Sequence, residues 1–105
     1  MSRILTIDQG TTSSRSIIFD QNANIQASAQ EEYPLIFPDD GWVEINPEHI
    51  YRSVVTTLNS LDLSGIEYAG LTNQRETTVI WDRDTHEPIY NAIVWQDRRT
   101  SDFCK

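Results

Sequence analysis

The chain has 105 residues, with 16 acidic and 8 basic side chains and a net charge of −8. This length supports one domain core rather than two. The acidic balance argues against nucleic acid and anionic membranes as partners, because both are bound mainly through Lys and Arg. The one cysteine, Cys104, excludes an intrachain disulfide and fits a reducing compartment. No signal peptide or membrane-length apolar run is visible, so we expect a cytoplasmic protein.

Three strands are predicted at the start of the chain. Residues 4–8 form an apolar run typical of a buried strand, and residues 15–20 are rich in β-branched and aromatic side chains. Residues 25–31 alternate between apolar and polar side chains, as a half-exposed strand does. Because short turn-forming segments separate these runs, the pattern predicts an antiparallel three-strand meander.

The turn between the first two strands has the composition of a phosphate-binding loop. Its sequence DQGTTSSR, residues 8–15, combines a carboxylate, a glycine, four hydroxyls and an arginine. Backbone N–H groups in a turn can form an anion-binding concavity, and glycine lets the backbone approach a ligand closely. Arg15 can face phosphate oxygens, and Asp8 can hold a magnesium ion through water. An ordinary hairpin turn uses the same residue types, so both interpretations stay open on these residues alone.

A long connection follows the meander. We expect an extended loop over residues 33–46 and a helix that begins at Asn46-Pro47-Glu48, where a cap residue precedes proline and an acid. Ser64-Gly65 is expected to end this helix, and residues 66–72 are expected to form a strand. A strand, a helical connection and another strand predict a crossover with parallel pairing. The helix carries one apolar stripe, formed by Ile50, Val54, Leu58 and Leu61.

The last third of the chain has two further apolar segments. Thr77–Trp81 and Ile89–Trp95 flank the polar turn 82–86, which predicts a hairpin or two short excursions. Residues 97–101 are expected to begin a helix, with Asp97 at the end that favours an acid. Two histidines and one cysteine give no zinc-binding spacing.

Four blocks follow one another along the chain: DQGTTSSR (8–15), GWVE (41–44), TNQRETT (72–78) and YNAIVWQDRR (90–99). Together, in this order, they resemble the FGGY carbohydrate kinase family, and within it the members that act on glycerol. The resemblance covers essentially the whole chain but only the beginning of such an enzyme. It implies an α/β fold that is part of a ribonuclease-H/actin-like domain. The mixed sheet of this domain opens with the antiparallel three-strand meander and continues through a helix crossover. Residues 1–105 are therefore expected to be an incomplete N-terminal kinase domain, with the C-terminal domain absent.

The resemblance implies phosphoryl transfer from ATP to glycerol, giving glycerol 3-phosphate, with ATP and Mg²⁺ as cofactors. Asp8 is similar to the aspartate near the magnesium of the nucleotide. Arg75 and Glu76 match the pair that hydrogen-bonds glycerol hydroxyls, and Trp95 matches an aromatic wall against the glycerol carbon chain. The contacts to the nucleotide phosphates fall on Gly10, Thr11, Thr12, Ser13 and Arg15.

The family's catalytic base is an aspartate far downstream, so no catalytic residue is expected in these residues and we expect the chain alone to be inactive. Apolar surface left by missing elements is expected to drive assembly into a homo-oligomer. Arg75 beside Glu76 also has an ordinary interpretation as solvated surface charge, and Trp95 as core or lid packing. Two alternative functions stay open: another FGGY sugar or polyol kinase, and a non-catalytic truncated module that binds a ligand or partner.

Overall fold

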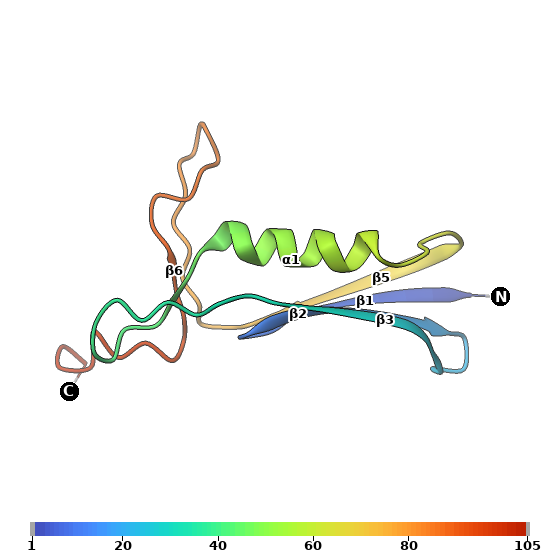
Figure 1. Cartoon of the computed structure of the whole chain (residues 1–105), viewed down its shortest axis with the longest axis horizontal. Helices are drawn as coiled ribbons and strands as arrows, with labels where there is room; N and C mark the ends of the chain where they lie inside the picture. The colour runs from blue at the N-terminus through green and yellow to red at the C-terminus, as the bar shows by residue number, and fades with distance from the viewer. Residues whose placement is uncertain (1, 105) are drawn as a thin grey trace.

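A mixed four-stranded sheet with one helix on it forms most of the computed structural model, which describes residues 2–104 (Figure 1). The strand order is β3-β2-β1-β5. Strand β1 pairs antiparallel with β2 and parallel with β5, and β2 pairs antiparallel with β3. The predicted meander and the predicted parallel crossover are therefore confirmed. The strands span β1 Arg3–Gln9, β2 Ser13–Asp20, β3 Ile25–Glu32 and β5 Ile66–Asn73.

The crossover helix α1 (Pro47–Asn59) begins where the sequence predicts. Asn46 is its N-cap, and the Asn46 Oδ1 atom accepts a hydrogen bond from the backbone N–H of Glu48 at 2.9 Å. Pro47 occupies the first turn, where its missing N–H costs nothing, and Glu48 lies near the positive end of the helix dipole. These local preferences explain why the start of α1 can be predicted from sequence.

The end of α1 and its buried face differ from the prediction. The helix stops at Asn59 rather than Ser64-Gly65, because Asp62 Oδ1 accepts a hydrogen bond from the backbone N–H of Ser64 at 3.0 Å and forms a separate turn. Leu61, expected in the apolar stripe, therefore lies beyond the helix. The helix is also rotated relative to that stripe, since its buried residues are Ile50, Ser53 and Thr57.

The contact between α1 and β2 is partly polar. Ser14 and Ser16 of β2 and Ser53 and Thr57 of α1 are at most 2% exposed. The Ser53 Oγ atom lies 2.7 Å from Ser14 Oγ, and Ser16 Oγ lies 2.8 Å from Thr57 Oγ1. Ile18, which is fully buried, continues the same face of β2. Hydroxyl pairs thus connect the helix to the strand that follows the polar turn.

We expect Ser14→Ala and Ser53→Ala each to lower the free energy of unfolding by about 1–3 kcal/mol, because each leaves a buried hydroxyl with one partner fewer. The double variant should lose less than the sum, since it removes both hydroxyls. Urea denaturation of the single and double variants, followed by circular dichroism, gives the coupling energy. Strictly additive losses would contradict a direct hydrogen bond between the two side chains.

A second, two-stranded sheet lies beyond one end of the main sheet. Residues 33–46, predicted to be an extended loop, contain β4 (Glu44–Ile45), which pairs antiparallel with β6 (Ala92–Ile93). The loop prediction is wrong for these residues because the pairing partner lies far along the chain. The small sheet carries its own apolar core, formed by Tyr33, Val43, Ile45, Ile50 and Val94.

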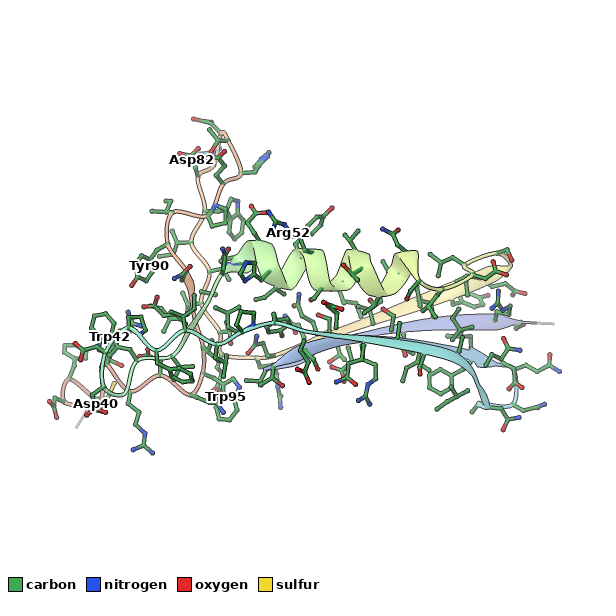
Figure 2. The ribbon with its side chains drawn as sticks, in the orientation of Figure 1. Asp40, Trp42, Arg52, Asp82, Tyr90 and Trp95 are labelled. Carbon is green, nitrogen blue, oxygen red and sulfur yellow. The ribbon has the colours of Figure 1, made fainter. Side chains whose placement is uncertain are left out.

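The segment between β5 and β6 projects from the rest of the molecule (Figure 1). Trp81 and Pro88 form an antiparallel bridge, and the backbone N–H of Asp82 donates to Glu87 O at 2.8 Å. Figure 2 shows Asp82 near the tip of this segment. The predicted hairpin is therefore present.

The predicted helix is not formed: residues 97–98 have no regular structure and residues 99–104 form turns. The reason is that groups near this position bond to the preceding loop. The backbone N–H of Arg98 donates to Gly41 O at 2.6 Å, and Asp97 Oδ2 accepts from the backbone N–H of Val43 at 2.7 Å. Residue 105 lies outside the described residues.

The molecule has an open form. Its radius of gyration is 16.4 Å, against ~13 Å for a compact domain of about 100 residues. Helix α1 packs mainly on β2 and β3 and covers one face of the sheet (Figure 1). Large side chains of β5 are open to solvent, with Tyr68 69% and Leu71 71% exposed.

Among residues 2–104, no helix has the length and apolar character needed to span a membrane.

Candidate functional site

Asp8 and Arg15 lie on the sheet face opposite α1. They are cross-strand partners in β1 and β2, whereas Ser14, the neighbour of Arg15, faces the helix. The Arg15 Nη2 atom donates to Gln30 Oε1 at 2.9 Å, and Gln30 Nε2 donates to Ser13 Oγ at 2.9 Å. Strand alternation and these contacts therefore place Asp8, Ser13 and Arg15 of the predicted phosphate site on the sheet face opposite α1.

The turn between β1 and β2 is held closely by its neighbours. The backbone N–H of Gly10 donates to Ser13 O at 2.8 Å, and a Cβ atom at position 10 would lie 3.1 Å from that oxygen, which favours glycine. Tyr33 supports the turn from the other side: its backbone N–H donates to Thr12 O at 3.0 Å, and its hydroxyl donates to Gly10 O. Burial, and then the charge of Asp8, raise the pKa of Tyr33 to about 12, so this hydroxyl keeps its proton.

Three residues of the predicted polyol site line one cavity. Arg75, Glu76 and Trp95 surround a volume of about 410 Å³. The Trp95 Nε1 atom donates a hydrogen bond to Thr11 Oγ1 at 3.1 Å, although the two residues are 84 positions apart. Figure 2 shows Trp95 beside the end of the main sheet. The fold therefore brings the polyol residues next to the phosphate turn, as the proposed roles require, while the roles themselves stay predictions.

Glu76 has a left-handed backbone conformation, with φ of 61°. Residues other than glycine adopt this region rarely, at a cost of order 1–3 kcal/mol. Such conformations cluster at ligand-binding sites. The position of Glu76 in the wall of the cavity is consistent with that tendency.

An ion cluster that is largely buried was not predicted from the sequence. The Arg99 Nη2 atom lies 2.6 Å from Glu44 Oε2 and 2.8 Å from Asp97 Oδ2. The Tyr90 hydroxyl and Asn91 Nδ2 also donate to Glu44, at 2.7 and 3.1 Å. The Glu44 side chain is 1% exposed. Both ion pairs found within residues 2–104 involve Arg99.

The only sequence signal for this cluster is an acid within an apolar run, since Glu44 lies between Val43 and Ile45. A carboxylate buried in this way needs a partner, but the run does not say which arginine supplies it. Burial opposes ionisation of Glu44, yet hydrogen bonds from Arg99 and its other donors lower the pKa of Glu44 overall. Hydrogen bonds from Arg99 lower the pKa of Asp97 to about 2.

These pKa values predict loss of stability in acid. The folded-state pKa of Asp97, about 2, lies below its ordinary value of 3.8. Its contribution to stability is therefore complete above about pH 4 and is lost as the pH falls towards 2. We expect Asp97→Asn to flatten this part of the stability curve, whereas Asp40→Asn, in the exposed loop, should not. Urea denaturation at a series of pH values checks this, and an unchanged slope in Asp97→Asn would contradict it.

Asp8 is compatible with the predicted magnesium role. Residues 2–104 contain no group of three His, Cys, Asp or Glu side chains that could enclose a metal ion. Magnesium bound to a nucleotide does not need such a group, because it keeps several waters and takes one or two carboxylates together with phosphate oxygens. Asp8 is exposed at the start of the turn, so its carboxylate can meet such an ion.

The fold and the neighbouring turn and cavity define an actin-like α/β domain of the sugar kinase class. The family model described as the N-terminal domain of the FGGY family of carbohydrate kinases matches residues 3–105. The chain belongs to this family.

Individual relatives agree with this assignment. The chain is 59% identical to a glycerol kinase of Xylella fastidiosa (strain 9a5c) over 107 residues, covering 96% of this chain and 21% of that protein. It is 56% identical to a glycerol kinase of Marinomonas sp. (strain MWYL1) over 108 residues, covering 97% of this chain and 22% of that protein. The chain thus spans only 21–22% of the length of these curated relatives.

Solved structures show the same fold. The crystal structure of Plasmodium falciparum glycerol kinase with ADP matches with a TM-score of 0.89 and 35% identity, covering 98% of this chain and 22% of that one. The ligand-bound xylulose kinase of Lactobacillus acidophilus matches with a TM-score of 0.87 and 25% identity, covering 98% and 21%. The predicted partial actin-like fold is therefore confirmed.

Proposed function

We propose that this chain forms the phosphate-turn and polyol-binding part of an ATP-dependent glycerol kinase, which transfers the terminal phosphoryl group of ATP to a glycerol hydroxyl. One observation carries the proposal. Trp95 lines a cavity with Arg75 and Glu76 and at the same time donates a hydrogen bond to Thr11 in the turn. A polyol in the cavity would therefore lie beside a phosphate held by the turn, which is the geometry that phosphoryl transfer needs.

The cavity residues suit a small polyhydroxy ligand. The Arg75 guanidinium offers only donors and the Glu76 carboxylate only acceptors, so the pair can satisfy hydroxyl groups in both directions. Trp95, which is 53% exposed, can pack its ring against the C–H edge of the ligand. These complementary groups support glycerol as the substrate.

The turn residues suit the nucleotide phosphates. The Arg15 guanidinium is hydrogen-bonded to the neutral side chain of Gln30, so its charge is not cancelled by that contact. The hydroxyls of Thr11, Thr12 and Ser13 add donors next to it. A bound Mg²⁺ would neutralise phosphate charge, with Asp8 as its protein carboxylate. Because ATP is the proposed phosphoryl donor, we propose that the reaction takes place in the cytoplasm.

The experiment is a chimera in which this chain replaces the matching N-terminal segment of the Xylella fastidiosa glycerol kinase. We expect Mg-ATP-dependent phosphorylation of glycerol with a kcat of about 1–10³ s⁻¹ in a coupled ADP-release assay, and no turnover by the 105-residue chain alone. A parallel chimera with the Marinomonas segment controls for the junction.

The outcomes separate the competing functions. A preference for a pentulose or gluconate over glycerol would favour another FGGY kinase. An inactive chimera, beside an active Marinomonas control, would favour a non-catalytic binding module. Turnover by the isolated chain would show that the catalytic base lies within these residues after all.

We also propose that the protein forms homo-oligomers. Large apolar side chains are exposed on β5 and on the projecting hairpin, among them Leu71, Ile80 and Ile89, at 71%, 60% and 66%. Exposed apolar surface of this kind favours association between copies. Size-exclusion chromatography with light scattering should show a species larger than the monomer, and a monomer at all concentrations would contradict this.

A further inference from the structure

The segment around Trp95 has little regular secondary structure of its own. Trp95 follows β6 in a segment of turns and is 53% exposed. Loop segments with little burial are ordinarily mobile. A side chain that forms one wall of a ligand cavity must nevertheless hold its place to within a fraction of an ångström.

Three hydrogen bonds hold the Trp95 segment against the loop that precedes α1. The backbone N–H of Val94 donates to Val43 O at 3.0 Å, and the backbone N–H of Arg98 donates to Gly41 O at 2.6 Å. The backbone N–H of Val43 in turn donates to Asp97 Oδ2 at 2.7 Å. These bonds lie on both sides of Trp95 along the chain.

Arg99 connects these two segments through its side chain. Its Nε atom lies 3.0 Å from both carboxylate oxygens of Asp97, and its Nη2 atom bonds Glu44 at 2.6 Å. The guanidinium carbon also lies 4.0 Å from the centre of the Trp42 ring. The Arg99 guanidinium thus contacts Trp42 and Glu44 in the loop before α1, and Asp97 in the Trp95 segment. These contacts need a planar group that donates several hydrogen bonds and also stacks on an aromatic ring, and the ammonium group of lysine cannot do both.

Stability alone does not explain such a cluster. Desolvation of buried ions offsets most of their attraction, so apolar side chains of similar volume often stabilise a fold as well. An ion cluster can do more than such apolar side chains in one respect: it can select one arrangement of the segments that it joins. Here the selected arrangement places Trp95 beside Thr11 and in the cavity wall with Arg75.

We propose that Arg99, clamped by Glu44 and Asp97, is a positioning residue that holds Trp95 in the wall of the polyol cavity. It does not touch the cavity itself, and it acts only through the Trp95 segment. The kinetic part of its test rests on the proposed glycerol kinase activity. The spectroscopic part does not, so the two proposals can fail separately.

The spectroscopic test follows the indole N–H of Trp95 in the 105-residue chain by ¹⁵N NMR, with the peak assigned by Trp95→Phe. We expect Arg99→Lys to speed solvent exchange of this proton by about 10-fold or more, because its hydrogen bond to Thr11 opens more often. Arg98→Lys is the matched control, since Arg98 contributes only its backbone to the contact with Gly41. Equal exchange in Arg99→Lys and the control would overturn the proposal.

The kinetic test uses the active chimera. We expect Arg99→Lys to raise KM for glycerol by about 10-fold or more while KM for Mg-ATP changes by less than about 2-fold, because only the polyol wall is displaced. A purely structural role would lower the melting temperature and the active fraction but leave KM for glycerol unchanged, and that result would overturn the proposal. If Arg99→Lys does not fold, Asp97→Asn, which weakens the same clamp, must show the KM increase.

Discussion

Replacing Glu44 with alanine is expected to lower the free energy of unfolding by about 3–5 kcal/mol, because it leaves the buried Arg99 cation without one of its two carboxylates. The Glu44 side chain is 1% exposed and that of Arg99 is 17% exposed, so water cannot fully replace the lost partner. The Tyr90 hydroxyl and Asn91 amide would also lose their acceptor. Urea denaturation followed by circular dichroism measures the change.

Two further variants make this prediction specific. Glu31→Ala removes an exposed carboxylate from β3, and we expect it to change the free energy of unfolding by at most about 0.5 kcal/mol. Adding Arg99→Met to Glu44→Ala should cost less than the sum of the two single losses, since Glu44→Ala has already removed one of the two carboxylates that Arg99 binds. A loss below about 1 kcal/mol for Glu44→Ala would mean that solvent reaches the cluster and screens it, as at a surface ion pair.

The second large effect is expected at the polyol cavity. Arg75→Ala and Glu76→Gln should each reduce kcat/KM for glycerol in the chimera by about 10–150-fold, the equivalent of one charged hydrogen bond at ~1.5–3 kcal/mol. Neither variant should change the melting temperature much, because both side chains are exposed. The coupled ADP-release assay measures the loss.

The control is Arg83→Ala, which removes an exposed arginine from the projecting hairpin and should leave kcat/KM unchanged. If Arg75→Ala matched this control, Arg75 would be a solvated surface charge, and the proposed polyol site would lose its main donor. A loss for Glu76→Gln with xylulose but not glycerol as substrate would instead point to another kinase of the family.

The elements that could be predicted from the sequence are those with local causes. An apolar run predicts β1, β-branched and aromatic content predicts β2, and alternation of side chains predicts β3. Asn46-Pro47 predicts the start of α1, because all these patterns depend on residues close together in the chain. The four blocks were enough to indicate the FGGY family, which the match over residues 3–105 confirms. The same blocks also predict Arg75, Glu76 and Trp95 as site residues, and these three line one cavity.

The features that depend on distant partners follow from the three-dimensional fold and not from local sequence. Glu44 and Arg99 are 55 residues apart, and Thr11 and Trp95 are 84 apart. The pairing of β4 with β6, the turns in place of a helix after Asp97 and the rotated face of α1 also arise from such long-range contacts. No local preference of the chain specifies these partners, because hydrogen bonds and ion pairs across the fold outweigh the propensities of the segments that they join.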